Sequence, residues 1–194
     1  PEPDEDAEIE YAAAKRLGEK QVLAAFPKAT ILRPSIVFGK DDKFINMFAG
    51  LISNLPVLPV FAPDAKLQPV YVDDVAEAAV RALEQPDVFG GKIHELGGPE
   101  QLSMMDINRA IAEAQYRERS FLPMPDAISA IFAALPGTPM GSDQWELLKS
   151  GNVVSGDHPG FDKFGISPRP LSLFLDKWMV QYRKHGRFNE RASV

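Results

Sequence analysis

Residues 67–83 read LQPVYVDDVAEAAVRAL, a short strand that runs directly into a helix. Leu67–Val72 predicts a short strand. Asp74 is followed three residues later by Glu77, which resembles a capping box, and the alanine-rich stretch that follows favours a helix to about Leu83. A strand that leads straight into a helix is the repeating unit of α/β sheets, so this stretch sets the expected fold class.

Further strands and helices alternate on both sides of this unit. Residues 7–26 predict a helix, and residues 29–38 (ATILRPSIVF) predict a buried strand interrupted at Pro34. Residues 44–55 predict a second, mostly apolar helix, and residues 92–96 (KIHEL) alternate as a strand does. The pattern indicates an α/β fold with a parallel sheet, although the three or four recognisable strands are fewer than the six or so of a doubly wound nucleotide-binding fold.

The second half of the chain is mostly helix and loop. Ser103 and Asp106 are spaced to cap a helix that ends near Arg117. Further helices are expected over residues 126–135, 143–149 and 170–185. We therefore expect an acidic boundary segment at residues 1–10, a sheet domain at 11–100, and a mostly helical substrate or cap lobe at 101–194 that is intertwined with it.

The charge of the chain is concentrated at its start. The 194 residues carry a net charge of −6, and the first ten contain six acidic and no basic residues. The remaining sequence is neutral, which argues against a nucleic-acid partner, because such a protein needs a basic surface. The absence of cysteine excludes disulfides and thiolate metal sites. The acidic start differs from a basic targeting segment, so a cytoplasmic location is expected.

Tyr11 and Lys15 are the strongest candidates for chemistry. They lie four residues apart in the first predicted helix, so both project from one face. A nearby ammonium group stabilises a phenolate and brings the pKa of tyrosine down from about 10 toward neutrality, which suits proton transfer during hydride chemistry. Spacing alone is also compatible with an exposed helix face on which the two side chains have no chemical role.

Four blocks in a fixed order strengthen the functional interpretation. They are YAAAKRLGE at 11–19, ILRPSIVFGKDD at 31–42, QPVYVDDVAEAAVRAL at 68–83 and KIHELGGPEQLSMMDI at 92–107. Together they resemble the C-terminal part of the extended and atypical short-chain dehydrogenase/reductase superfamily. Residues 68–78 and 149–171 are most similar to the atypical branch that includes bacterial relatives of the nucleotide-binding accessory subunit of respiratory complex I.

The resemblance implies roles for particular residues. Tyr11 matches the general acid/base, and Lys15 matches the residue that contacts the nicotinamide ribose; both are also expected to bind the cofactor. Pro34, Ser35 and Ile36 match the strand end beside the nicotinamide ring.

Other residues carry weaker implications. Gln68 and Val70 lie where relatives build the substrate pocket. Asp74 matches a position that we interpret as a helix N-cap. His94 is expected to be a packed or surface residue, and no metal site is expected, because the three histidines are not spaced as ligands.

The resemblance also implies a Rossmann-type fold that binds NAD or NADP. The glycine-rich turn that binds the pyrophosphate in that fold does not occur in this sequence, and no Ser or Thr precedes Tyr11. We therefore expect the chain to be a C-terminal portion that lacks the N-terminal dinucleotide-binding half, with Pro1 at a cut or boundary. Such a portion alone is expected to be inactive.

Three functions agree with the sequence. The first is an NAD(P)-dependent oxidoreductase or epimerase with an unknown small-molecule substrate. The second is a non-catalytic nucleotide-binding accessory subunit, associated with a respiratory complex at the inner face of a membrane. The third is a domain that works without a Rossmann half. A homo-oligomer is compatible with each, and the basic C-terminal end is either a solvated helix end or a contact with an anionic membrane or partner.

Overall fold

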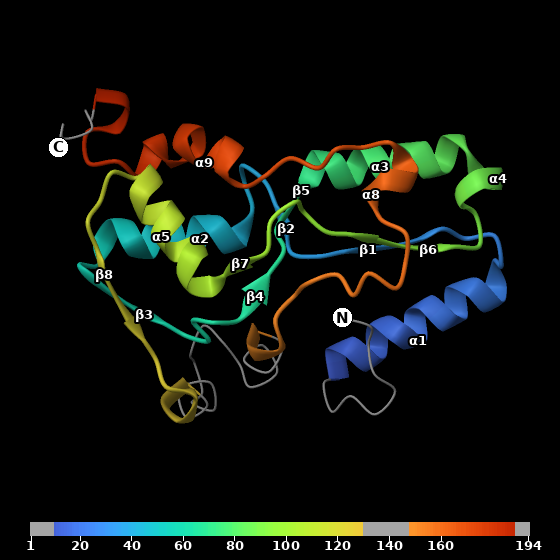
Figure 1. The fold of residues 1–194 in the computed structure, drawn as a ribbon, viewed down its shortest axis with the longest axis horizontal. Coiled ribbons are helices and arrows are strands. Elements are labelled where there is room, and N and C mark those ends of the chain that lie inside the picture. The colour runs from blue at the N-terminus through green and yellow to red at the C-terminus, as the bar shows by residue number, and fades with distance from the viewer. Residues whose placement is uncertain (1–9, 130–147, 189–194) are drawn as a thin grey trace.

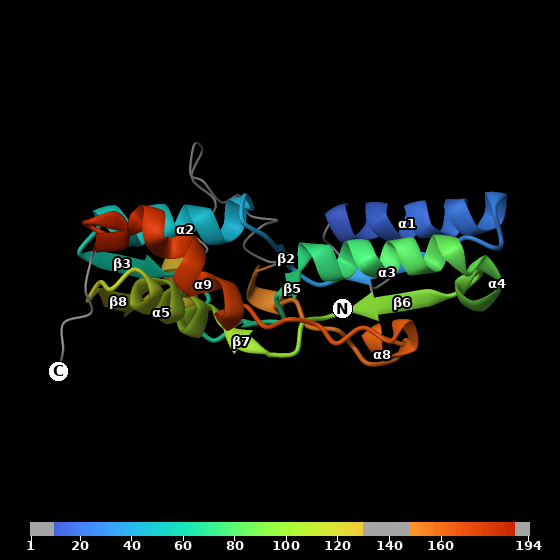
Figure 2. The same cartoon turned by 90° about the horizontal axis from the view of Figure 1, so that it is seen from above.

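The computed structural model describes the backbone of residues 10–129 and 148–188, and the side chains of those ranges from Ala13 onward. These residues form two lobes that lie end to end (Figure 1). One lobe is built around strands β1 and β6 and is called the β1 lobe here. The other is built around helix α5 and is called the α5 lobe. Figure 2 shows the same division from above.

The β1 lobe is a parallel strand pair with helices on both faces. Strand β1 (Ile31–Pro34) pairs in parallel with β6 (Ile93–Leu96), and Arg33 lies opposite Glu95. Helix α1 (Glu10–Ala25) lies along one face, while the opposite face is covered by other helices (Figure 1). These are α3 (Val72–Glu84), α4 (Pro86–Phe89) and α8 (Phe161–Phe164). A core that includes Leu96, Phe89 and Phe164 fills that second face.

The α5 lobe contains the larger core. Strand β3 (Val57–Val60) pairs in parallel with β8 (Ser120–Pro123), and helix α2 (Lys43–Asn54) packs against α5 (Met104–Ala114). Near the end of the chain, this lobe also contains α9 (Ser172–Trp178) and the two 3-10 turns η1 (Met179–Tyr182) and η2 (Gly186–Phe188). The core of this lobe contains residues from both sides of position 100. The predicted domain boundary between residues 100 and 101 stays a prediction.

Short strands and aromatic rings join the two lobes. Strand β2 (Val37–Phe38) runs parallel to β5 (Val70–Tyr71), and β4 (Lys66–Leu67) runs antiparallel to β7 (Leu102–Ser103). The Tyr71 ring stacks on Phe174 with 4.2 Å between centroids, and Phe174 stacks on Trp178 at 4.8 Å. Aromatic pairs at these separations are stabilising, so they fix α9 against the junction.

Most predicted elements of the first half are confirmed. The predicted break at Pro34 separates β1 from β2, and the Ser103–Asp106 capping box is present at the start of α5. The predicted strand at 67–72 is divided into β4 and β5, with Val72 already in α3. Helix α1 is confirmed from Glu10, while residues 7–9 lie outside the described part.

The predicted role of Asp74 is wrong. Helix α3 begins at Val72, three residues earlier than an N-cap at Asp74 predicts, so Asp74 lies in its first turn and Tyr71 precedes the helix without a side-chain cap. The carboxylate of Asp74 is buried. It accepts hydrogen bonds from the backbone N–H of Arg169 (2.8 Å) and from its Nε (2.7 Å). This aspartate therefore ties the segment before α9 to α3.

The second half departs further from the prediction. Helix α9 ends at Trp178 and is followed by 3-10 turns, so the predicted helix to residue 185 is too long. Helix α8 and strand β8 were not predicted, since Gly and Pro around them are typical of loops. The predicted helix at 126–135 is helical at 126–129, and its remainder lies outside the described residues. The same holds for the predicted helix at 143–149, of which only 148–149 are described.

His94 is a buried core residue, as one of its two predicted placements has it. Its ring makes edge-on contacts with Phe89 (centroids 5.6 Å apart) and Phe164 (4.7 Å apart). Burial lowers the pKa of His94 below its ordinary value of about 6.5, and Lys92 and His158 act in the same direction. The backbone of Pro159 and the negative charge of Asp162 act in the opposite direction and raise this pKa.

The Asp74 contact predicts a specific loss of stability. We expect Asp74→Asn to lower the free energy of unfolding by about 2 kcal/mol, because it weakens a buried ionic contact whose arginine is partly solvated. The matched change Asp73→Asn at the exposed neighbour should cost less than about 0.5 kcal/mol. Urea unfolding of the full-length natural polypeptide measures both. Equal effects at the two positions would contradict the assigned role.

His94 predicts a pH dependence of stability. A pKa lower in the folded than in the unfolded state means that protonation favours unfolding, so stability should decrease as the pH falls below about 6.5. We expect His94→Leu to reduce this decrease and the exposed control His185→Leu to leave it unchanged. Melting temperatures between about pH 8 and about pH 5 measure the slope. A wild-type slope retained in His94→Leu would refute the assignment.

Candidate functional site

The two predicted catalytic residues lie on α1. Tyr11 is part of this helix, but its side chain is outside the described residues. Lys15 follows one turn later and its side chain is exposed. Their predicted contact therefore stays a prediction, while their common helix is confirmed.

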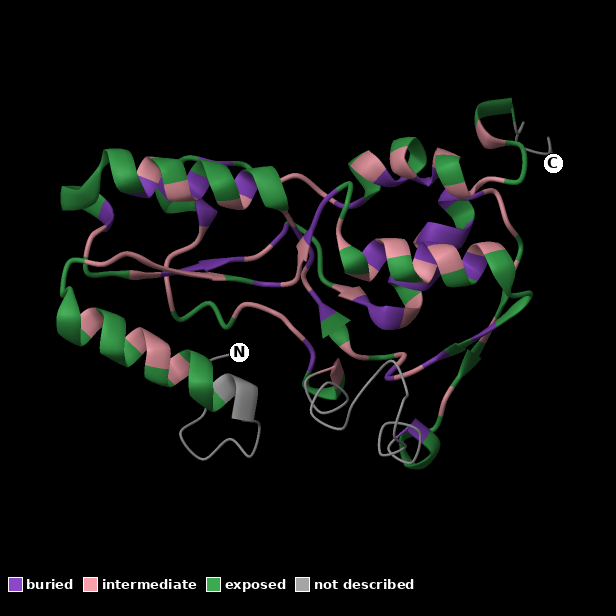
Figure 3. Cartoon of the chain, turned by 180° about the vertical axis from the view of Figure 1, so that it is seen from behind, coloured by how far each residue is buried: buried purple, intermediate pink, exposed green. Residues whose placement is uncertain are grey.

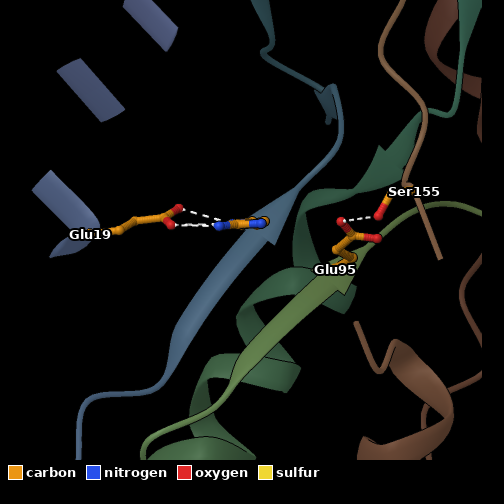
Figure 4. A network of polar contacts seen from close by, with 4 residues as sticks. Glu19, Glu95 and Ser155 are labelled. Atoms are coloured by element: carbon orange, nitrogen blue, oxygen red, sulfur yellow. Dashed lines mark hydrogen bonds and ion pairs between the residues drawn. The ribbon is translucent and has the colours of Figure 1, made fainter. Parts of the chain in front are cut away.

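An ion pair connects α1 to the carboxyl end of β1. The Nε of Arg33 donates to both carboxylate oxygens of Glu19, at 3.1 and 3.3 Å, and its Nη2 donates to Oε2 at 2.8 Å. Both side chains are about four-fifths buried. Figure 4 shows Glu19 reaching from α1 toward β1. Because Arg33 directly precedes Pro34, the Glu19–Arg33 ion pair connects α1 to the end of β1.

The structure brings together the predicted residues at that strand end. Pro34 ends β1, and the backbone N–H of Ser35 donates to the carbonyl of Leu96 at the end of β6 (3.0 Å). The N–H of Val70 donates to the carbonyl of Ile36 (2.9 Å). Residues 34–36 and 68–70 therefore meet at the carboxyl edge of the strand pair, where ligands bind in open parallel sheets.

Gln68 holds this meeting point together. Its amide nitrogen donates to the carbonyl of Gly98 (2.8 Å), and its amide oxygen accepts from the N–H of Val154 (3.2 Å). Its backbone N–H donates to the carbonyl of Asn152 (2.9 Å), which also accepts from the Ser35 hydroxyl (2.9 Å). These contacts cover the strand ends with the segment at residues 152–156.

The close approach at this point requires a glycine. A β-carbon added at Gly98 would lie 1.7 Å from the carbonyl oxygen of Pro69. The Gly-Gly-Pro sequence therefore does more than end β6, since it lets the backbone beside Gln68 lie against the strand end.

Val70 has 0% of its surface exposed, and the amide of Gln68 is hydrogen-bonded at both ends. Their predicted role in a substrate pocket stays a prediction.

Glu95 is a site residue that sequence reasoning did not find. It is 5% exposed, and its carboxylate accepts from the Ser155 hydroxyl and from the N–H of Gly156, both at 2.9 Å. Figure 4 shows this contact beside the one made by Glu19. An acidic residue within the short strand KIHEL was the available signal, because a buried carboxylate needs a partner.

The strand end suits a dinucleotide better than a metal. Pro34 at the strand end and Lys15 on α1 are both exposed, and an ammonium group can donate to ribose hydroxyls. Among residues 10–129 and 148–188, no group of three or more His, Cys, Asp or Glu side chains could hold a metal ion. Within the same ranges, no helix is long and apolar enough to cross a membrane.

A separate open groove lies near the opposite end of β1. It has a volume of about 540 Å³ and is lined mainly by apolar side chains, among them Phe26, Leu32, Ala82 and Leu83. The groove runs between β1 and the exposed ends of α3 and α4. It does not include Pro34, Ser35 or Ile36, so it is distinct from the site at the strand end.

The comparisons with known proteins show the family and the fold of the chain. Residues 4–139 match the family model described as RmlD substrate binding domain. Subunit 9 of the NADH dehydrogenase [ubiquinone] 1 alpha subcomplex from mitochondria of Mus musculus is 33% identical over 189 residues, covering 93% of this chain and 48% of that protein. The chain spans about half the length of the curated relatives that it matches over most of its sequence.

Solved structures share the fold. A nucleoside-diphosphate-sugar epimerase from Staphylococcus aureus has a TM-score of 0.66 at 16% identity, covering 90% of this chain and 61% of that one. A dTDP-4-dehydrorhamnose reductase from Bacillus anthracis, in complex with NADP, has a TM-score of 0.62 at 18% identity, with 88% and 54% covered. These structures confirm the predicted Rossmann-like α/β fold. On the family match over most of its length, this chain belongs to the RmlD substrate-binding domain family.

Proposed function

We propose that the full-length natural polypeptide containing this chain binds NAD or NADP, with the nicotinamide end at the carboxyl edge of β1. In this proposal the ring lies beside Pro34, Ser35 and Ile36, and Lys15 donates to the nicotinamide ribose. The observation that supports it most is the convergence of residues 34–36 and 68–70 at a strand end that an ion pair ties to the helix of Tyr11 and Lys15. The proposed activity is that of an oxidoreductase or epimerase.

Tyr11 is the proposed general acid/base. When bound, the dinucleotide supplies hydride-transfer chemistry at a substrate carbon. Tyr11 would donate a proton to the substrate oxygen, or accept one from it. The ammonium group of Lys15 would favour the phenolate that remains after proton donation. The hydrogen bonds of Gln68 and Ser35 hold the segment at residues 152–156 over the strand end, which would limit the access of water.

A second candidate function is supported by a different observation. The similarity to the mouse complex I subunit extends over 93% of the chain. We therefore keep the alternative of an accessory subunit that binds a nucleotide without turning over a substrate. Such a protein would associate with a respiratory complex at the inner face of a membrane. The oxidoreductase would instead be a cytoplasmic protein, as a monomer or a homo-oligomer.

Nucleotide titration tests the shared part of both candidates. We expect the full-length natural polypeptide to bind NADPH or NADH. The fluorescence of the reduced nicotinamide ring measures this binding. Lys15→Ala should weaken binding about tenfold, because it removes a charged hydrogen bond. Tyr11→Phe should leave binding within about twofold, since its hydroxyl acts on substrate. Binding of neither nucleotide would refute the proposal.

The two candidates differ in turnover and in association. A reductase should oxidise NADPH or NADH when supplied with a small-molecule extract of its source cells, and Tyr11→Phe should slow that oxidation about 100-fold. An epimerase returns the hydride to its substrate, so it should convert the substrate without net oxidation of the nucleotide. An accessory subunit should show no such oxidation and should copurify with a respiratory complex in fixed proportion. A soluble protein with reductase activity would contradict the accessory role.

A further inference from the structure

We propose that Glu19 and Arg33 are positioning residues, whose ion pair sets the place of α1 along β1 and thereby holds Lys15 beside the nicotinamide ribose. This inference rests on the proposed function. It adds two residues to the site, neither of which contacts substrate or nucleotide itself.

The geometry of the pair restrains the helix in more than one direction. Arg33 donates through Nε and Nη2, so a planar guanidinium faces the two oxygens of Glu19. A paired contact of this kind fixes orientation as well as distance, which a lysine cannot do. Both side chains are largely removed from solvent, with 18% and 21% of their surfaces exposed, so water screens the contact only in part.

Within the described residues, α1 places no side chain in a core. No side chain from Ala13 to Ala25 is buried, and Figure 3 shows the described part of this helix without buried colour. By contrast, α2, α3 and α5 each place several side chains in a core. Among the described residues, the ion pair with Arg33 is therefore an oriented polar restraint on α1 that acts without a buried apolar side chain of the helix.

The spacing along the two elements connects the pair to the site. Glu19 follows Lys15 by four residues, which places both on one strip of the helix, about one turn apart. Arg33 precedes Pro34 by one residue in β1. The ion pair therefore joins the turn next to Lys15 to the residue next to the proposed nicotinamide position. A small slide of α1 would move Lys15 relative to that position.

The neighbouring carboxylate has its own partners. Glu95 lies opposite Arg33 in the strand register, but its oxygens accept from Ser155 and Gly156. Two adjacent charged residues thus hold two different covering segments, with Arg33 holding α1 and Glu95 holding residues 155–156. We therefore infer that Arg33 of β1 positions α1 through Glu19.

The test uses NADPH and NADH as probes of the full-length natural polypeptide. We expect Glu19→Gln and Arg33→Lys each to weaken nucleotide binding about tenfold, since displacement of a positioned group by a fraction of an ångström has effects of this size. Glu77→Gln is the matched control. It removes the exposed ion pair with Arg81 on α3 and should change binding less than about twofold. Thermal melts identify variants that fail to fold.

A double-mutant cycle separates positioning from a general structural effect. In a Lys15→Ala background, Glu19→Gln should weaken binding less than about twofold, because the group that it positions is gone. A tenfold effect that persists in this background would overturn the proposal, as would an effect of Glu19→Gln without one of Arg33→Lys. Normal binding by both variants, with Lys15→Ala impaired, would overturn it while sparing the proposed function. If wild-type protein binds neither nucleotide, the proposed function fails and this inference fails with it.

Discussion

The parallel pairing of β1 with β6 is the constraint on which the candidate site depends. It places Arg33 opposite Glu95 and Pro34 opposite Leu96, so that both strands end at the same edge. From that edge, Arg33 reaches α1 and Glu95 reaches the segment at Ser155. A shift of the register by one residue would turn these side chains to the other face, where His94 and Leu96 pack in the core. The positions of α1 and of the segment at Ser155 therefore both follow from the register of β1 with β6.

The fold could be predicted from the sequence wherever local chemistry decided it. Pro34 breaks the strand because it lacks an N–H, and Ser103 with Asp106 caps α5 through contacts three residues apart. Asp74 shows the limit of this reasoning. Its spacing to Glu77 imitates a capping box, but its partner is Arg169, which lies 95 residues away in sequence. No local pattern distinguishes an aspartate that caps a helix from one that binds a distant arginine.

The candidate site shows the same division. Tyr11, Lys15 and residues 34–36 could be proposed because the blocks that contain them match a family pattern. The contacts that hold them together could not, because they join segments far apart in sequence. Asn152 accepts hydrogen bonds from both Ser35 and Gln68, and Glu95 binds Ser155, across separations of 60 residues or more. Such contacts depend on how the strands pair, which a single sequence does not specify.

We propose above all that a nicotinamide dinucleotide lies at the carboxyl edge of β1. Amide hydrogen exchange of the full-length natural polypeptide, with and without saturating NADPH or NADH, tests this position most directly. We expect slower exchange on binding in residues 31–38 and in α1, with little change in α2 of the other lobe. Slower exchange confined to α2 and α5, with residues 31–38 unaffected, would contradict it.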